Sequence, residues 1–517
     1  MSSTLDHLMT GFGVALTPMN LMLGAIGSFL GTIVGMLPGL GPINGVAILM
    51  PLAFALNLPP ESALILLVAV YLGCEYGGRI SSILLNVPGD AAAIMTAVDG
   101  YPMARKGLGG VALSISAWSS FVGSMIAIAG LVVAAPLLAQ WALAFGPAEY
   151  FALMVFAFAC LTGLMGDQPV KAALAAVLGL SLATVGIDAN SGVYRFTFDS
   201  VHLSDGIQFV AVVIGLFSVS EILLMLEQVA AGNGMITQTG RNMFNLNEMR
   251  QTWWGTVRSS VVGFFVGVLP GAGATIASAM TYSMEKRLTD TEGTFGKGDI
   301  RGVAAPEAAN NASAAGSFVP MLTLGVPGSG TTAVMVGALS LYNITPGPAL
   351  FEQRPELVWG LIASMFIGNF MLLAMNIPMI RVFTRILSVP NWALVPGILA
   401  VSTVGVYAIH ATTFDLVLMT VLGVVGYGLR KLHMPMAPLI LGFVLGELIE
   451  QNLRRALSIT NGDWGILWQS GISVAFWVGT SLMLTLPFVA RMVIARRRQA
   501  QAGALPPAAT ESVAPQP

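Results

Sequence analysis

Long apolar stretches separated by short polar segments run along almost the whole chain of 517 residues. A helix needs about 20 mainly apolar residues to cross the hydrocarbon core of a bilayer. Several stretches are shorter than this or are interrupted by Pro-Gly, so the pattern predicts roughly 10 to 13 crossings together with half-length or re-entrant pieces. The candidate segments are residues 20–37, 43–57, 63–86, 111–137, 148–165, 170–187, 207–230, 255–283, 304–326, 329–345, 357–377, 390–409, 413–429, 434–449 and 470–495.

Charged residues are too few to cover a surface that faces water. They make up 9% of the chain, whereas hydrophobic residues make up 55%, and the formal net charge is −2. A soluble domain carries roughly 25% charged residues. This deficit excludes a soluble enzyme, a protein that binds nucleic acid and a disordered scaffold. The sequence therefore predicts an all-α polytopic membrane protein embedded in a lipid bilayer.

Two Gly/Pro-rich motifs occur twice and in the same order. Residues 31–41 align without gaps on residues 263–273, with seven of the eleven positions identical, and residues 85–90 correspond to residues 324–329. We therefore expect a duplicated chain. The first repeat covers residues 1–230, with motifs near 35–44 and 85–92. The second covers residues 231–495, with motifs near 267–275 and 306–332 and additional helices, and residues 499–517, rich in Ala, Pro and Gln, form a disordered cytoplasmic tail.

The basic residues indicate that the two repeats have opposite orientations. The segment between the motifs of the first half, residues 57–61, has no Lys or Arg, whereas residues 285–301 of the second half have four. After the second motif the bias reverses, with Arg105 and Lys106 in the first half against Arg354 in the second. Cytoplasmic loops carry the excess of Lys and Arg, so the pattern predicts two inverted-topology repeats. It places the N-terminus in the periplasm and the C-terminus, which is rich in Arg, in the cytoplasm.

The repeated motifs predict broken helices. Pro has no N–H and Gly adopts backbone angles closed to other residues, so Pro-Gly interrupts a helix and frees polar backbone groups. In transporters such breaks lie near the midplane, where helix N-termini face anionic substrate and free carbonyls bind the coupling ion. The alternative is that the breaks are simple kinks or interfacial turns. The candidate substrate- or ion-binding residues at the breaks are Pro38, Gly39, Gly41, Asn44, Asn86, Pro88, Gly89, Asp90, Pro270, Gly271, Gly273, Thr275, Pro327, Gly328, Ser329, Gly330, Thr331 and Thr332, among which the hydroxyls of Ser329, Thr331 and Thr332 are candidates to hold a carboxylate.

A second group of candidates surrounds Glu307. Glu307 and Asn311 are four residues apart on one helix face, with Asn310 beside them. Their oxygens suit Na⁺ at the broken helices, and a carboxylate in an apolar site suits a proton relay, unless Glu307 only caps its helix. Arg79 is either the countercharge for an anionic substrate or the partner of Glu75, four residues earlier.

Sequence signatures of other functions are missing. The chain has no G-x-x-x-x-G-K-[ST] motif for ATP, no H-E-x-x-H motif and no G-x-S-x-G motif. We therefore expect no catalytic residues and no cofactor beyond a coupling ion, Na⁺ or H⁺. Two alternatives to an ion-coupled transporter stay open: an intramembrane enzyme that uses Asp90 and Glu307 as acid and base, and a passive channel.

The same motifs resemble a known family, the large membrane subunit (TctA) of the bacterial tripartite tricarboxylate transporters. The resemblance runs over residues 15–490 and is densest in residues 35–42, 76–92, 99–105, 269–274, 306–312 and 324–329. It implies a secondary transporter in the cytoplasmic (inner) membrane that takes up tricarboxylates or related carboxylates by symport. It also implies two partners, a periplasmic solute-binding protein and a small four-helix membrane subunit. Arg79 departs from the pattern, because a small or hydroxyl residue is expected there, and this leaves the substrate open.

Overall fold

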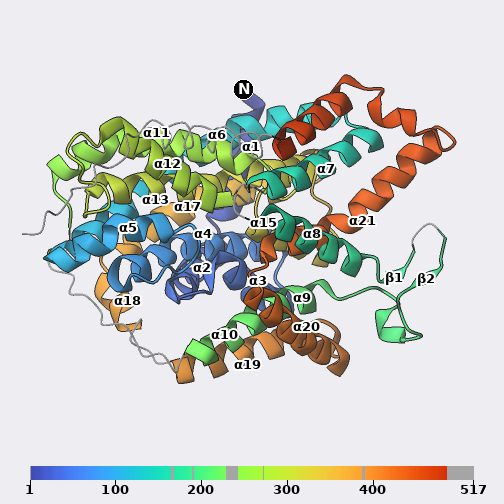
Figure 1. The fold of residues 1–517 in the computed structure, drawn as a ribbon, viewed down its shortest axis with the longest axis horizontal. Coiled ribbons are helices and arrows are strands. Elements are labelled where there is room, and N and C mark those ends of the chain that lie inside the picture. Colours follow the sequence, from blue (N-terminus) through green and yellow to red (C-terminus); the bar gives the residue numbers. More distant parts are fainter. Residues whose placement is uncertain are drawn as a thin grey trace, which may run out of the picture.

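The computed structural model describes residues 2–164, 168–188, 191–228, 241, 243–271, 273–386 and 391–485. Within these residues the fold is helical apart from one short two-stranded sheet (Figure 1). The tail at residues 499–517 lies outside the described part of the chain. The predicted all-α class is confirmed.

The helices of the first half are α1 (Ser2–Ala15), α2 (Pro18–Met36), α3 (Gly41–Ala55), α4 (Pro60–Leu85), α5 (Ile94–Met103), α6 (Gly109–Ala142), α7 (Pro147–Leu164), α8 (Pro169–Ala183), α9 (Phe209–Val213) and α10 (Ser220–Gln228), with π-helical turns at Ala104–Leu108 and Ile214–Val219. Those of the second half are α11 (Leu246–Val268), α12 (Gly273–Thr289), α13 (Ile300–Gly316), α14 (Phe318–Leu324), α15 (Gly330–Leu341), α16 (Leu350–Gln353), α17 (Pro355–Asn376), α18 (Ile380–Ile386), α19 (Asn391–His410), α20 (Thr413–Lys431) and α21 (Met436–Ile459), followed by a helix at Gly471–Thr485.

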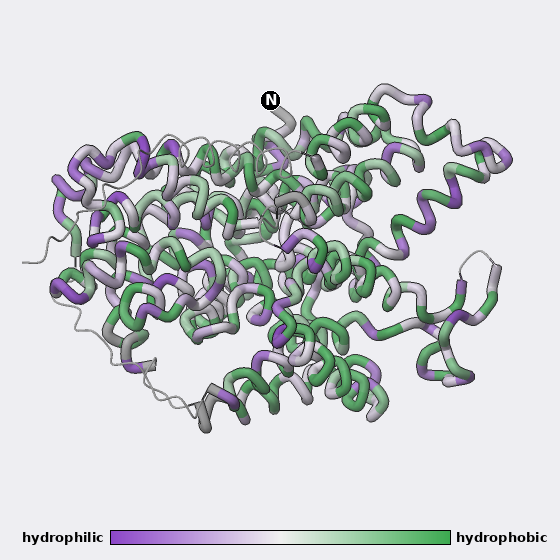
Figure 2. The backbone as a smooth tube through the Cα atoms, viewed as in Figure 1, coloured by the Kyte–Doolittle hydropathy of each residue, from purple (hydrophilic) through white to green (hydrophobic). Residues whose placement is uncertain are grey.

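Seven helical segments of the described residues are long and apolar enough to cross a membrane. Six shorter apolar helices accompany them, among them α3 and α15, which begin at the predicted breaks. Figure 2 shows apolar residues along most of the helices and hydrophilic residues gathered mainly near helix ends. The number of crossings, roughly 10 to 13 by the length criterion, stays a prediction because the short helices are candidates for half-spans.

The sheet is a feature that the sequence did not predict. β1 (Gly186–Ile187) and β2 (Tyr194–Arg195) pair antiparallel, with Gly186 opposite Arg195. They lie in the connection between α8 and α9, at the right of Figure 1.

Two helix pairs, one from each half, pack unusually closely through glycine. A Cβ atom on Gly31 of α2 would lie 2.3 Å from the carbonyl oxygen of Val70 in α4, so only glycine fits there. In the second half, a Cβ atom on Gly263 of α11 would lie 2.5 Å from the carbonyl oxygen of Ala309 in α13. Small residues let membrane helices approach to backbone contact. The first helix of each pair, α2 or α11, ends directly before one of the predicted breaks.

Candidate functional site

The first break lies between α2 and α3. Leu37 leaves α2 in an extended conformation (φ −76°, ψ 123°). Gly39 then takes a left-handed φ of +84°, which L side chains rarely adopt, and its N–H donates to the carbonyl oxygen of Gly89 at 3.2 Å. α3 begins at Gly41, which is also left-handed (φ +56°). The two Pro-Gly motifs of the first half therefore meet in space.

The second half makes the same turn. Leu269 leaves α11 at φ −75° and ψ 123°, Gly271 has a φ of +78°, and Gly273 starts α12 at a φ of +63°. The N–H of Gly271 donates to the carbonyl oxygen of Gly328 at 3.0 Å. The sequence alignment pairs each of these residues with its counterpart at the first break. In each half, a backbone hydrogen bond between equivalent glycines thus joins the two Pro-Gly motifs.

Four short helices, α3, α5, α12 and α15, start from these breaks. α3 and α15 pack together and run the same way. Near their starts, a Cβ atom on Gly330 would lie 2.7 Å from Cδ1 of Ile43. Near their ends, the hydroxyl of Tyr342 donates to the carbonyl of Ala53 at 3.5 Å. α5 and α12 run together elsewhere, where the hydroxyl of Tyr282 donates to Asp99 at 2.9 Å. Each helix N-terminus carries a partial positive charge. The arrangement therefore gathers four such ends around the breaks.

Arg79 of α4 is the largest side chain that the structure buries completely. Its Nη1 lies 3.8 Å from Oε2 of Glu307 and donates to the hydroxyl of Ser120 at 2.9 Å. Its Nη2 donates to Oδ1 of Asn376 at 3.4 Å, and the guanidinium lies 4.4 Å from the centre of the Tyr76 ring. The guanidinium is therefore held by residues from four helices.

Glu307 joins this cluster from α13. It is fully buried, and its Oε1 accepts a hydrogen bond from the hydroxyl of Thr96 at 2.5 Å. Its Oε2 accepts one from the hydroxyl of Ser120 at 3.1 Å. A buried carboxylate is stable when it has such charged and hydroxyl partners.

Two alternatives drawn from sequence spacing are wrong. Arg79 does not form its ion pair with Glu75 on the same helix, but with Glu307 on α13. Nor does Glu307 cap α13, because Asp299 does so by accepting a hydrogen bond from the N–H of Arg301. Spacing of four residues brings side chains to one helix face, but tertiary neighbours decide which of them pair.

Glu75, one turn before Arg79, is buried without such partners. Its side chain is 3% exposed, and Oε2 accepts no hydrogen bond from the residues that the structure describes. The amide of Asn310 lies beside it, and the carboxylates of Asp90 and Glu307 are within electrostatic range. Neither Oδ1 nor Nδ2 of Asn310 has a hydrogen-bond partner in the described part of the chain.

The start of α15 contacts α4 one turn before Glu75. The hydroxyl of Tyr71, one turn before Glu75 in α4, is 3.4 Å from Oγ of Ser329. Ser329 caps α15 by accepting a hydrogen bond from the N–H of Thr332, whose hydroxyl accepts one from the N–H of Ser329. Two of the three hydroxyls expected to face substrate therefore already serve this cap, while Thr331 lies near Tyr71.

Some of the other candidate residues are buried or partly buried, and others are exposed. Asp90 is partly buried and accepts a hydrogen bond from the N–H three residues later at 2.8 Å. Asn44 and Asn311 are buried, each donates to the carbonyl four residues earlier, and each keeps an Oδ1 without a partner among the described residues. Asn86 and Thr275 are exposed and lie apart from the buried cluster. The remaining candidates lie at the breaks themselves: Pro38, Pro88, Pro270, Pro327 and Gly330.

Several residues of the cluster were not predicted. Thr96, Ser120 and Asn376 are single polar residues within apolar helices, and only the fold brings them to Arg79 and Glu307. The first break also has an unpredicted neighbour. A Cβ atom on Gly39 would lie 2.0 Å from Oε1 of Glu221 in α10, which forms an ion pair with Arg430 of α20.

A cavity of about 980 Å³ lies elsewhere, beside the β1–β2 sheet and the end of α21. Ion pairs join its walls, between Arg195 and Glu450 at 2.7 Å and between Arg454 and Asp188 at 3.1 Å. It reaches Gly325, just before the second-half break, but not the buried ion pair. In the ranges that the structure describes, no three His, Cys, Asp or Glu side chains are grouped so that they could hold a metal ion.

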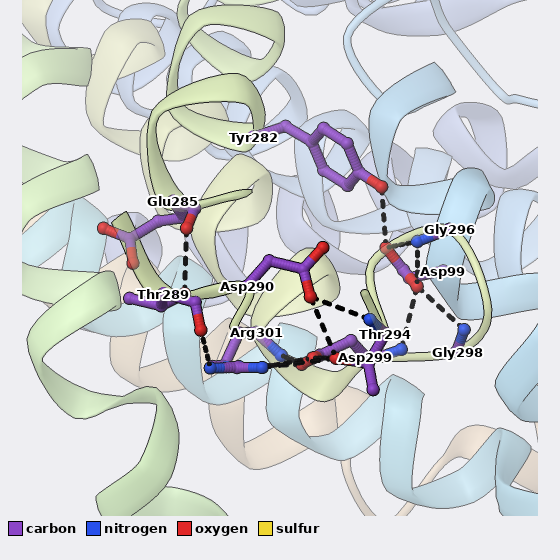
Figure 3. Close-up of polar contacts among 10 residues, drawn as sticks. All are labelled: Asp99, Tyr282, Glu285, Thr289, Asp290, Thr294, Gly296, Gly298, Asp299 and Arg301. Atoms are coloured by element: carbon purple, nitrogen blue, oxygen red, sulfur yellow. Dashed lines mark hydrogen bonds and ion pairs between the residues drawn. The ribbon is translucent and has the colours of Figure 1, made fainter. Parts of the chain in front are cut away.

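Asp99 of α5 occupies a second buried acidic site, drawn in Figure 3. Its carboxylate accepts hydrogen bonds from the N–H groups of Gly296, Gly298 and Asp299 at 2.8 to 3.0 Å. It also accepts one from the hydroxyl of Tyr282. Asp99 therefore fastens α5 of the first half to the loop between α12 and α13 of the second.

Comparison with known proteins identifies close relatives. The model of the tripartite tricarboxylate transporter TctA family matches residues 21–441. An uncharacterized 52.8 kDa protein in the TAR-I ttuC' 3' region of Agrobacterium vitis is 42% identical over 463 residues, which cover 90% of this chain and 92% of that protein. A protein in the TAR-II ttuC' 3' region of the same organism is 47% identical over 201 residues, 39% of this chain and 83% of that protein. No solved structure matches the chain.

Proposed function

This multi-pass membrane protein belongs to the tripartite tricarboxylate transporter TctA family, and from that premise we propose that it takes up tricarboxylates or related carboxylates, driven by a gradient of Na⁺ or H⁺. It works as the large membrane subunit with a periplasmic solute-binding protein and a small four-helix membrane subunit. The family is one of transporters, so the alternative of an intramembrane enzyme is wrong. A passive channel stays as the second candidate.

The observation that carries the proposal is the matched pair of breaks. Gly39 bonds to Gly89 in one half as Gly271 bonds to Gly328 in the other, and four half-length helices start there. Interrupted helices with polar ends beside buried charges are typical of secondary transporters. The positive ends favour a carboxylate substrate, and the buried carboxylates favour a coupling cation.

We further propose that the two halves are inverted repeats, with residues 1–230 and 231–495 as their bounds. One contact supports this topology: Nζ of Lys106 donates to the carbonyl of Lys297 at 2.6 Å, so two basic segments at non-equivalent positions of the halves share one face. The positive-inside rule assigns this face to the cytoplasm and the N-terminus to the periplasm. Labelling of single cysteines at positions 57 and 297 from opposite sides of the membrane tests this, and labelling of both from the same side contradicts it.

Uptake of labelled carboxylate into proteoliposomes, with the two partner proteins present, tests the function. We expect saturable uptake that stops when the Na⁺ and H⁺ gradients are both collapsed. Uptake that continues unchanged would contradict ion coupling. A flux that rises linearly with substrate would instead indicate a channel.

Glycine variants test the role of the breaks in the same assay. A Cβ atom on Gly271 would lie 2.3 Å from Cγ of Leu161, and one on Gly328 would lie 2.9 Å from the backbone of Gly267. We expect Gly271→Val and Gly328→Val to insert normally but to lose transport. Gly368→Ala in α17 is the matched control. A Cβ atom at this position has no heavy atom of the described residues within 4 Å. Normal transport by both valine variants would mean that the breaks are only kinks.

A further inference from the structure

Glu75, Arg79 and Glu307 form a group of charged side chains on α4 and α13 that are almost completely buried, at 3%, 1% and 0% exposure. Arg79 and Glu307 compensate each other and share the hydroxyl of Ser120. When all three are ionised their charges sum to −1, and the surplus belongs to Glu75. Asp90, partly buried nearby, adds negative potential.

An isolated charge in an apolar interior is among the most costly arrangements in a protein. The amide of Asn310 is placed to donate to Glu75, but neither its Nδ2 nor Oε2 of Glu75 makes a hydrogen bond of ordinary geometry in the described structure. Oε2 of Glu75 and Oδ1 of Asn310 are both acceptors without a donor among the described residues. A bound cation would give both of these acceptors a partner.

The remaining neighbours extend this set of oxygens. The hydroxyl of Tyr71 lies one helical turn before Glu75 and is 3.4 Å from Oγ of Ser329. Thr331, in the first turn of α15, lies near the same hydroxyl. Carboxylate, amide and hydroxyl oxygens without nitrogen or sulfur ligands suit a hard cation. A set with one carboxylate suits a monovalent ion.

We propose that the Glu75 carboxylate, with oxygens of Asn310, Tyr71 and Ser329, binds the coupling ion and that this ion is Na⁺. A proton on Glu75 would supply a donor to one acceptor at most, whereas a sodium ion uses several oxygens at once. The inference rests on the proposed function, since it assigns the ion of the same site. It also assigns a binding role to Glu75 and Tyr71, which the sequence motifs did not single out.

This site explains how ion and substrate would be coupled. Without Na⁺, the negative charge of Glu75 lies beside the start of α15 and repels an approaching carboxylate. With Na⁺ bound, the charge is cancelled and the helix end is free to attract the anion. Because coupling between two sites is reciprocal, substrate must then raise the affinity for Na⁺ by the same factor.

Equilibrium binding of ²²Na⁺ to the purified full-length chain in detergent, with no substrate or partner protein, tests the site. We expect saturable binding by the wild type and a loss of affinity of at least about tenfold in Glu75→Gln and in Asn310→Ala. Glu285→Gln is the matched control, because it removes a buried carboxylate that pairs with Arg258 instead. Its Na⁺ affinity should stay at the wild-type value.

Folding is checked in the same samples. Na⁺, compared with choline, should raise the melting temperature of the wild type and of Glu285→Gln but not that of Glu75→Gln. In size-exclusion chromatography, Glu75→Gln should elute as the wild type does. Wild-type affinity in both Glu75→Gln and Asn310→Ala overturns the site, as does a wild type that binds no Na⁺.

Uptake measurements separate this inference from the proposed function. Uptake that remains Na⁺-driven in Glu75→Gln overturns the site and leaves the function standing. Glu75-dependent Na⁺ binding without any uptake by the reconstituted complex supports the site and overturns the function.

Discussion

Asp99 and Glu75 are both carboxylates buried among helices, but their surroundings are opposite. Asp99 is fully buried and accepts hydrogen bonds from three backbone N–H groups and from Tyr282 (Figure 3). Glu75 is buried almost as deeply, yet its Oε2 has no donor among the residues that the structure describes. A carboxylate with every acceptor position filled by the protein holds two segments together. One with an acceptor left unfilled by the protein can bind a ligand.

The Arg79–Glu307 ion pair lies between these extremes and gives the largest expected effect on stability. Glu307→Ala leaves the Arg79 guanidinium buried without its countercharge, and breaking a buried pair in this way costs about 3–5 kcal/mol. Unfolding of the purified protein in mixed micelles measures this change. The double variant Arg79→Met with Glu307→Met should recover most of the loss, because no charge is then left unpaired.

A single variant as stable as the wild protein would show that water reaches Arg79. The contrast between Asp99 and Glu75 would then lose its basis, because water would also reach Glu75. The site proposed at Glu75 predicts the reverse sign for Glu75→Gln. Removal of an uncompensated charge should leave stability in Na⁺-free buffer unchanged or increased.

The next effect concerns Asp99. Asp99→Asn keeps the shape of the side chain but loses the charge that strengthens hydrogen bonds from the loop and from Tyr282, so we expect a loss of about 2–3 kcal/mol. Tyr282→Phe removes one of these bonds and should cost about 1 kcal/mol. Both variants should bind ²²Na⁺ as the wild protein does. Weakened binding would mean that the loop and the Glu75 site are not independent.

The sequence predicted the breaks well because they depend on local chemistry. Pro-Gly favours a helix break on local grounds and marks one at all four aligned motifs, although Pro396-Gly397 lies inside α19. The alignment pairs Gly39 with Gly271 and Gly89 with Gly328, which form equivalent hydrogen bonds. The membrane class could be predicted because it depends only on composition, namely few charged and many hydrophobic residues. The family follows from the length of the matching motifs.

The partners of the buried charges could not be predicted in the same way. The spacing of Glu75 and Arg79 offered a sufficient local explanation, an ion pair on one helix face. In the structure Arg79 contacts residues of α6, α13 and α17, more than 40 positions away in the sequence. A lone hydroxyl such as that of Ser120 in an apolar helix carries no sign of its tertiary neighbour. The sequence therefore assigned Glu75 to Arg79 and not to a binding site, whereas in the structure Arg79 pairs with Glu307.

The smallest expected effect is a pH dependence at the edge of the Asp99 site. Burial would raise the pKa of Asp299, but hydrogen bonds from Arg301 and Thr294 outweigh it and hold the pKa of this carboxyl below its ordinary value. The folded state therefore favours the ionised form. The stability that this gives is fully present above the ordinary pKa of Asp, about 3.9, and is lost as the pH falls through the lower folded value.

Melting temperatures measured from about pH 7 down to about pH 3 in the wild protein and in Asp299→Asn isolate this contribution. The difference between the two should be greatest at neutral pH and should shrink on acidification, because the wild protein alone loses the ionised cap of α13. A constant difference would mean that the pKa of Asp299 is the same in the folded and the unfolded state. Since the N–H of Asp299 also donates to Asp99 at 2.8 Å, the acid transition should loosen the loop and α5 together. It should leave Na⁺ binding at Glu75, measured at neutral pH, the same in both proteins.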